Sequence, residues 1–477
     1  MAQNAAWQAA LDYLYGFVNW ETKAAGVRPA YQLDRIRTLL TAVGEPQRAW
    51  PAVHVGGTNG KGSTCAMIAS ALQAAGYRVG LYTSPHMHTV RERVQVDSRP
   101  IAEAEVLAWI ARRRDLLAQH AGVTTFEALT LLAFEHFARS AVDVAVVEVG
   151  LGGRLDTTRV VQPVVTIMAS IGMDHREVLG DTLRQIASDK VGIFRPGVPI
   201  ISAPQEPEAL AVVQAEAERM VAPLTLVGRD ATWGQVAIDR GGQRFAVTVR
   251  EGEGGGEGGG REVAYDVATV LHGPHQRINA TVAVAVLDAL RRAGWHIDAA
   301  AVQRGIAAAR WPGRFERLGP PPGDRDIAVI ADGAHNPPAI AALLATLAEV
   351  YPTRQRTIVI LGIGGEKDRA EMLAALVPAA DIVFTARADH PKAVSAAALA
   401  DEVVGAGGIA TARANPSDAL DAALAAAEPG DVVLATGSIF LAADVREAAA
   451  DRGWLRIEDR DPPTSERPAV GKKGVRG

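Results

Sequence analysis

Cysteine is nearly absent from this chain, which carries only Cys65 among its 477 residues. A single thiol excludes an internal disulfide and is typical of proteins from a reducing compartment. The first residues, MAQNAAWQAALDYLYGFVNWE, also lack the basic start and apolar core of a signal peptide. We therefore expect a cytoplasmic protein in which Cys65 is a packed core thiol.

Long apolar runs and an excess of positive charge are missing as well. No stretch approaches the roughly 20 uninterrupted apolar residues that a membrane span needs. The 49 basic residues are outnumbered by 54 acidic ones, so the net charge is −5, and nothing attracts a nucleic acid electrostatically. Hydrophobic residues make up 48% of the chain, which is a globular balance. The composition thus argues against membrane and nucleic-acid partners, and the length predicts two or three domains.

What the chain does have is a glycine-rich turn at His54–Ser63, HVGGTNGKGS, between a predicted strand and a predicted helix. In such a turn, backbone N–H groups close around phosphate oxygens, the helix N-terminus adds partial positive charge, and Lys61 supplies a full charge. The match to the usual phosphate loop is imperfect, because Gly57 lies too close to Gly60 and because Gly62 stands where a hydroxyl is expected. An ordinary glycine turn is the alternative, but the junction favours phosphate binding.

The rest of the chain alternates predicted strands with predicted helices, which indicates an α/β protein with doubly wound parallel sheets. Residues 1–50 read as helices that cover a sheet edge. In the first part of the chain, buried strands are predicted at residues 50–55, 77–83, 142–148 and 164–168. Residues 223–270 instead favour a small antiparallel sheet, and we expect its glycine-rich segment, 251–260, to be a mobile hairpin tip.

Prolines and glycines at residues 311–325 indicate an interdomain linker. Beyond it, strands are predicted at residues 327–331, 357–361, 381–385 and 431–435. We therefore predict a phosphate-loop NTPase-like N-terminal domain over residues 1–310, which includes the small antiparallel sheet. A smaller Rossmann-like α/β C-terminal domain is predicted over residues 326–458. The charged, proline-bearing tail, residues 459–477, is expected to be disordered.

Polar side chains stand where several predicted strands end, and ligands bind at that edge of an open α/β sheet. Glu148 ends one strand and could hold Mg²⁺ opposite the phosphate loop, although it could also be a surface acid. His175 follows Asp174 after the next strand, as either a metal or phosphate ligand or a structural histidine. Lys190 lies on a predicted helix, where the residues alone favour a solvated side chain.

An ordered set of motifs resembles the folylpolyglutamate synthase family, within the wider superfamily of muramyl peptide ligases. The resemblance extends from the phosphate loop to Thr436-Gly437-Ser438 and so covers nearly the whole chain. Its motifs are GTNGKGS, SPH (Ser84–His86), FExxT (Phe126–Thr130), EVGLGGRLD (Glu148–Asp156), DHxxxLGxT (Asp174–Thr182), the lysine at 190, HQxxN (His275–Asn279), PGRFE (Pro312–Glu316) and DGAHNP (Asp332–Pro337).

The resemblance implies roles for particular residues. The ATP site would comprise Thr58, Asn59, Gly60, Lys61, Gly62, Ser63, Asn279, Arg314 and Asp332. The ligands of magnesium, with two ions expected, would be Ser84, Glu148 and His175. The pterin pocket would comprise Thr124, Thr125, Phe126, Glu127, Leu155, Asp156 and Thr157. Lys61, Lys190 and His335 would be catalytic, with Lys190 carbamylated by CO₂, which needs a buried and partly neutral amine.

The implied activity is that of an ATP-dependent carboxylate–amine ligase. It would add L-glutamate to tetrahydrofolate through an acyl phosphate, and also to dihydropteroate if the enzyme is bifunctional. Residues 1–310 would then bind ATP and pterin, and a monomer is expected. One alternative is a muramyl peptide ligase with a UDP-sugar acceptor, but only about 50 residues precede the phosphate loop, too few for a uridine-binding domain. A non-catalytic nucleotide switch is the second alternative.

Overall fold

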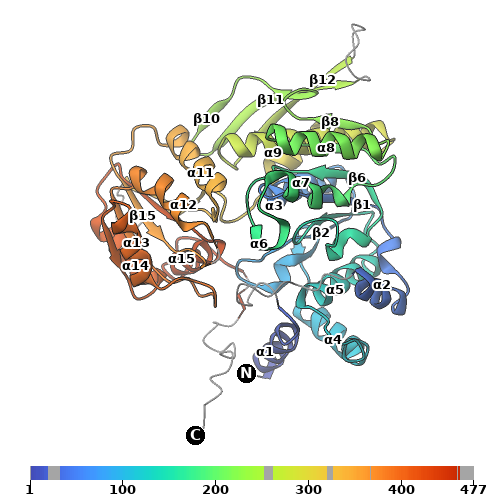
Figure 1. The fold of residues 1–477 in the computed structure, drawn as a ribbon, viewed down its shortest axis with the longest axis horizontal. Helices are drawn as coiled ribbons and strands as arrows, with labels where there is room; N and C mark the ends of the chain where they lie inside the picture. Colours follow the sequence, from blue (N-terminus) through green and yellow to red (C-terminus); the bar gives the residue numbers. More distant parts are fainter. Residues whose placement is uncertain are drawn as a thin grey trace.

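The computed structural model describes residues 2–19, 33–251, 261–319, 326–365, 367–458 and 460–461. Two α/β units lie side by side, with the N-terminal unit in blue to yellow and the C-terminal unit in orange to red (Figure 1). The predicted mobile tip falls outside the described residues from position 252 on, as do residues 320–325 of the predicted linker. Within the part of the chain that the structure describes, no helix combines the length and apolar character needed to cross a bilayer.

The N-terminal unit is built on an eight-stranded sheet in the order β4-β3-β2-β5-β1-β6-β7-β8. From β2 to β8 the neighbouring strands are parallel, whereas β3 and β4 form an antiparallel edge. The strands are β1 (Ala52–Gly56), β2 (Val79–Tyr82), β3 (Val94–Val96), β4 (Arg99–Pro100), β5 (Val144–Glu148), β6 (Pro163–Met168), β7 (Ile200–Ser202) and β8 (Leu224–Leu226).

Helices cover both faces of this sheet, because its strands are apolar on both sides. On β5, Val144 and Val146 pack into one core, and Ala145 and Val147 into another. The first core includes α3 (Lys61–Ala74), α9 (Pro274–Arg292) and α10 (Ala299–Ala308). The second includes α1 (Ala2–Tyr15), α2 (Leu33–Ala42), α4 (Glu103–Ala118) and α5 (Thr125–Arg139). A third core contains α7 (Leu183–Lys190) and α8 (Pro207–Arg219), while short α6 (Arg176–Leu179) precedes α7.

The small antiparallel sheet is confirmed as an outer layer of the same unit (Figure 1). It contains β9 (Ala231–Trp233), β10 (Ala237–Asp239), β11 (Gly242–Glu251) and β12 (Arg261–Thr269). Its apolar side chains, such as Phe245 and Val247, join the core of α9 and α10. The predicted range, 223–270, is wrong at its start, because β8 pairs with β7 in the main sheet.

The C-terminal unit is a six-stranded sheet in the order β13-β14-β18-β15-β16-β17. Its strands are β13 (Glu316–Leu318), β14 (Ala328–Ala331), β15 (Thr357–Leu361), β16 (Ile382–Thr385), β17 (Ala410–Ala412) and β18 (Val432–Thr436). Its two faces carry α11 (Pro337–Val350), α12 (Arg369–Leu376) and α13 (Ala396–Gly405) on one side, and α14 (Pro416–Ala426) and α15 (Ile439–Asp451) on the other. Strand β13 lies inside the predicted linker, so that prediction is wrong for residues 316–318, which pair with β14.

The end of the described chain returns to the N-terminal unit. The carboxylate of Asp461 accepts hydrogen bonds from Trp7 Nε1 (3.1 Å), Thr89 Oγ1 (2.9 Å) and Val90 N (2.8 Å). Disorder of the entire segment 459–477 is therefore a wrong prediction at Asp461, since a buried carboxylate with three donors has a fixed place. Residues 459 and 462–477 lie outside the described ranges.

Candidate active site

A single cavity of about 620 Å³ is lined by both units, and every site residue predicted from the sequence lies on its wall. The predicted ATP, metal, pterin and catalytic residues come from loops at the carboxyl ends of β1, β2, β5, β6 and β14, from the segment before β13, and from α3, α5, α7 and α9. A volume of this size suits a nucleotide or another ligand of similar mass. The fold thus brings together residues from position 58 to position 335, but their individual roles remain predictions.

The phosphate loop joins β1 to α3 at the floor of the cavity. Gly60 caps α3 with a left-handed backbone at φ 87°, which a residue with a side chain rarely adopts. Lys61 begins the helix, and its ammonium donates to Thr58 O at 3.0 Å, folded back over the loop. The amide Oδ1 of Asn279 lies 2.4 Å from where a Cβ of residue 60 would be. The free N–H groups at the start of α3 and the charge of Lys61 therefore face the same space.

The departure at Gly62 from the usual phosphate loop has a packing cause. The indole of Trp311 covers this position, and a Cβ at residue 62 would lie 2.9 Å from its Cζ2 and Nε1 atoms. A threonine or serine side chain has no room there. Ser63 follows one place later and is buried, and its hydroxyl accepts a hydrogen bond from Gln276 Nε2 at 3.2 Å.

Replacing Gly62 by alanine should lower the free energy of unfolding by about 1–3 kcal/mol, the usual cost of overpacking against a rigid ring. Urea denaturation would measure the change. Gly405→Ala is the matched control, because no atom lies within 4 Å of its added Cβ. Equal stabilities of the two variants would show that Trp311 does not confine the loop.

Lys190 is buried beneath the phosphate loop, with only 4% of its surface exposed. The prediction of a solvated lysine is wrong, because the last turn of α7 points under Gly57, whose carbonyl accepts from Lys190 Nζ at 2.9 Å. Burial, and then the charge of Lys61, lowers the pKa of Lys190 to about 7. A substantial fraction of this amine is therefore neutral at neutral pH, which is the state that reacts with CO₂.

This shift has a consequence for stability. Between the folded pKa of about 7 and the ordinary value near 10.4, the unfolded chain binds more protons at Lys190, so stability rises with pH. Relative to Lys190→Met, the wild type should gain about 1 kcal/mol per pH unit between pH 7 and 10 in CO₂-free buffer. Denaturant titrations of both proteins would measure it, and parallel pH profiles would contradict the assignment.

Glu148 ends β5 with a buried carboxylate that opens onto the cavity. Its Oε2 accepts from Ser84 N at 3.0 Å, and among the described residues Oε1 has no hydrogen-bond partner. Burial raises the pKa of Glu148, and the charge of Lys61 is the largest opposing effect. His175 lies on the same cavity but is 44% exposed at its side chain, 3.8 Å from Glu177. Over the described ranges, no three His, Cys, Asp or Glu side chains form a metal-binding group.

Two predicted pterin residues, Glu127 and Asp156, use their carboxylates to accept hydrogen bonds from neighbouring protein groups. Glu127 accepts from Thr124 N (2.8 Å) in a capping box at the start of α5, and from Arg35 Nε at 2.8 and 2.9 Å. Asp156 accepts from the backbone N–H groups of residues 150 and 151, both at 3.0 Å, and of residue 158 at 2.9 Å. Both side chains therefore shape the pocket wall and leave little capacity for a ligand.

The apolar part of that wall comes from Phe126 and Leu155. A Cβ at Gly150 would lie 2.5 Å from Phe126 Cζ, so the glycine lets the end of this ring approach the loop closely. Leu155 is 46% exposed and lines the cavity. The ring and this side chain offer a surface for a flat aromatic ligand.

The C-terminal unit contributes charged and polar groups through the segment 332–336. Asp332 is buried and accepts from Phe315 N (2.7 Å) and Ala334 N (2.8 Å), which fixes this segment to the one carrying Arg314. Burial, and then Lys367, lowers the pKa of His335 to about 3. With this pKa the imidazole is neutral at pH 7. Its Nδ1 donates to Gly333 O at 2.8 Å, which leaves the lone pair on Nε2.

Comparison with known proteins agrees with this arrangement. A family model described as Mur ligase middle domain matches residues 55–287, and one described as Mur ligase, glutamate ligase domain matches residues 313–439. A dihydrofolate synthase/folylpolyglutamate synthase of Bacillus subtilis (strain 168) is 33% identical over 452 residues, which cover 93% of this chain and 99% of that protein. The chain belongs to the folylpolyglutamate synthase family.

Solved structures of the family have the same fold. Folylpolyglutamate synthase of Mycobacterium tuberculosis complexed with ADP matches with a TM-score of 0.83 and 32% identity, over 95% of this chain and 99% of that one. Escherichia coli FolC in complex with DHPP and ADP matches with a TM-score of 0.77 and 30% identity, over 94% and 98%. The predicted fold class and family are thus confirmed, the protein is an ATP-dependent ligase, and the non-catalytic switch is set aside.

Several cavity residues of this family member were not assigned a role from sequence. His390 and Phe440 stack with ring centroids 4.2 Å apart, and Lys367, Lys392 and Ser438 lie on the same side of the cavity. Arg35, which lines the cavity and pairs with Glu127, was not assigned a role either. Of these, Lys367, Lys392 and Ser438 stand in glycine-bearing or proline-bearing segments after strands, a signal that could have marked them. Nothing in the sequence around Arg35 or the ring pair distinguishes them from structural residues.

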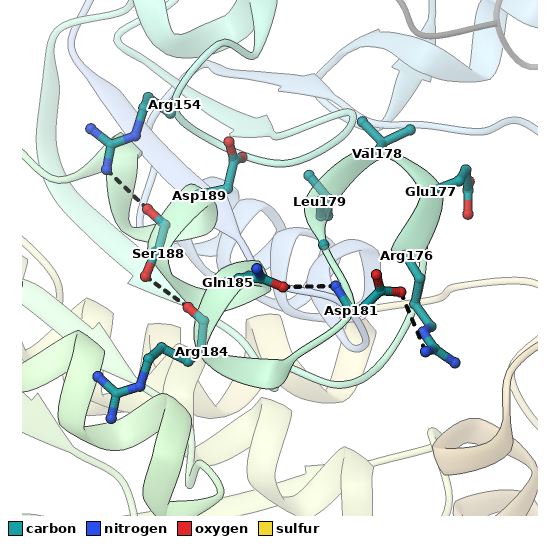
Figure 2. A pocket seen from close by; sticks show the side chains of 11 residues that line it. Arg154, Arg176, Glu177, Val178, Leu179, Asp181, Arg184, Gln185, Ser188 and Asp189 are labelled. Atoms are coloured by element: carbon teal, nitrogen blue, oxygen red, sulfur yellow. Dashed lines mark hydrogen bonds and ion pairs between the residues drawn. The ribbon is translucent and has the colours of Figure 1, made fainter. Parts of the chain in front are cut away.

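A second hollow, of about 730 Å³, lies on the other side of α6 and shares only Glu177 and Val178 with the main cavity. Figure 2 shows three arginines around it, Arg154, Arg176 and Arg184. Arg154 donates to Ser188 O at 3.0 Å, and Arg176 pairs with Asp181 at 3.3 Å. Arg154 and Arg176 are therefore already partnered near solvent, and none of the site residues predicted from the sequence lines this hollow.

Proposed function

We propose that this enzyme joins L-glutamate to the carboxylate of a folate-type acceptor, with ATP as the energy source. The observation that carries the proposal is the single cavity in which a phosphate loop, an aromatic pocket and a set of cationic side chains from the second unit meet. Each is the kind of surface that one of the three substrates needs.

The nucleotide would bind at the floor of the cavity. Lys61 and the N–H groups of residues 60–63 would hold its phosphates, where the helix N-terminus favours negative charge. Asn279 packs on Gly60, and Arg314 reaches the same space from the other unit. Asp332 would act mainly by fixing Arg314's segment, because both of its oxygens already accept backbone hydrogen bonds.

Magnesium, with two ions expected, fits part of the predicted ligand set. The open Oε1 of Glu148 and the hydroxyl of Ser84 are oxygen donors at the cavity wall, which suits this hard cation. The imidazole of His175 would become the third magnesium ligand only after it moves away from Glu177. When bound, magnesium would offset the negative charge of the transferring phosphoryl group. Carbamylated Lys190 would supply a further anion beneath the loop.

The acceptor would place its pterin ring against Phe126 and Leu155, near Thr157. Thr124 and Thr125 would form the base of this pocket, shaped by Glu127 and Asp156. Tetrahydrofolate and dihydropteroate share the pterin ring, and the relative from Bacillus subtilis is named for both synthase activities. We therefore propose a bifunctional enzyme that acts as a monomer.

The amino acid would bind on the C-terminal side. Lys392 and Lys367 offer positive charge for its carboxylates, and Ser438 and His335 offer polar atoms beside them. The acceptor carboxylate would attack the γ-phosphate to give an acyl phosphate and ADP. The amine of glutamate would then displace phosphate and form the amide. Two units around one cavity would also keep water from the acyl phosphate.

The test is phosphate release with ATP, Mg²⁺ and L-glutamate, with dihydropteroate, tetrahydrofolate or no acceptor, and with products weighed by mass spectrometry. We expect turnover on both acceptors, each gaining one glutamate. Turnover on tetrahydrofolate alone would reject bifunctionality, and turnover independent of both acceptors would reject the folate assignment.

A further inference from the structure

Asp174 lies on the loop after β6, and the phosphate loop holds that loop in place. Thr58 Oγ1 donates to Gly172 O at 3.2 Å and accepts from Gly172 N at 3.1 Å. The backbone N–H groups of Thr58 and Asn59 donate to Ser170 O at 2.8 and 3.1 Å. Four hydrogen bonds therefore make residues 170–172 a rigid extension of the phosphate loop, and Asp174 follows two residues later.

The carboxylate of Asp174 reaches across to the other unit. Its Oδ1 pairs with Lys367 Nζ at 2.8 Å, and its Oδ2 accepts from Asn336 Nδ2 at 3.1 Å. The pair with Lys367 is largely shielded from water, with side-chain exposures of 10% and 20%. Removing one partner of a shielded ion pair costs more free energy than removing one partner of a surface pair, because the remaining charge is left desolvated and uncompensated.

Asn336 connects the same cluster directly to the phosphate loop. The side-chain amides of Asn59 and Asn336 exchange hydrogen bonds of 3.2 and 3.1 Å. Asn336 is also the N-cap of α11, since its Oδ1 accepts from Ala339 N at 3.0 Å. A helix of the C-terminal unit thus begins at a residue bonded to both Asn59 and Asp174.

We infer that Asp174 is a positioning residue that seats the C-terminal unit on the phosphate loop, through Lys367 and Asn336. No role follows for Asp174 from the proposed function alone, and its carboxylate does not need to touch a substrate. It orients Lys367, which lines the same cavity as Lys61 and Lys190. The inference rests on the proposed function only for its kinetic readout.

The first test measures the arrangement of the two units without catalysis. Dyes on Val221→Cys and Ile409→Cys, which are 84% and 69% exposed and stand one on each unit, would report transfer efficiency with ADP and Mg²⁺ bound. Cys65 is buried and should stay unlabelled. Asp174→Asn should shift the transfer efficiency and broaden its distribution. The shift should be partial, because Arg277 and Glu349 also join the units, at 2.8 Å. An unchanged distribution would overturn the inference.

The second test is a double-mutant cycle that separates positioning from general damage. Asp174→Asn and Lys367→Met should each raise the KM for L-glutamate about tenfold, and the double variant should be no worse than the poorer single one. If the KM of the double variant instead rose by the product of the two single effects, the two residues would act independently and the inference would be overturned. Asp181→Asn is the control, an acid seven residues away in an exposed pair with Arg176, and it should behave as wild type. If the wild type is no ligase, the dye experiment still decides the inference.

Discussion

Replacing Lys61 by methionine should reduce kcat by about 10²–10³-fold, the usual cost of removing one fixed positive group at a developing charge. The methionine keeps the length of the side chain, so the start of α3 should form as before. The substitution removes the ammonium of Lys61, which lies over the loop and donates to Thr58 O at 3.0 Å. Phosphate release at saturating substrates would measure kcat, and calorimetry would measure ATP affinity.

Arg304→Met is the control for Lys61→Met, because it removes a cation from the exposed face of α10, outside the cavity. It should leave kcat within a few-fold of wild type. A similar kcat for Lys61→Met and the wild type would mean that the glycine turn is structural and that phosphate binds elsewhere.

Glu148→Gln should raise the magnesium concentration needed for half-maximal activity by at least about 10²-fold, a cost expected when a metal ligand loses its charge. The amide keeps the size of the side chain and can still accept from Ser84 N. Stability should not fall, because burial already disfavours the charged carboxylate and raises its pKa. Activity against Mg²⁺ concentration, with the melting temperature alongside, would measure both effects.

High magnesium should partly restore the activity of Glu148→Gln, whereas it should not restore Lys61→Met, which loses a protein charge instead. An unchanged magnesium dependence in Glu148→Gln would contradict its placement as a metal ligand. A loss of activity accompanied by a lower melting temperature would show that the carboxylate is structural.

The sequence was most informative where a short segment determines its own structure. The strand, glycine turn and helix around Lys61 need only local backbone geometry, so their prediction is confirmed. The cap of α5 is equally local, since Thr124 and Glu127 are three residues apart. Strand ends also placed Glu148 correctly, because parallel strands gather their carboxyl ends at one edge.

Sequence reasoning failed where a distant partner decides the environment. Lys190 looks like a surface lysine on its helix, and only the carbonyl of Gly57 above it shows that it is buried. Asp461 looks like tail, but its donors come from α1 and from the loop after β2. Asp156 was assigned to the pterin pocket by resemblance, and that role stays a prediction, but the sequence did not show that its carboxylate accepts hydrogen bonds from its own loop.

The central claim is that the acceptor carboxylate is activated by phosphoryl transfer inside this cavity. The most direct test uses tetrahydrofolate labelled with ¹⁸O in its reacting carboxylate, together with ATP, Mg²⁺ and L-glutamate. An acyl phosphate places one labelled oxygen in each phosphate released and leaves the other in the new amide. We predict one ¹⁸O per phosphate, matched to product by mass. Unlabelled phosphate alongside amide formation would contradict the account.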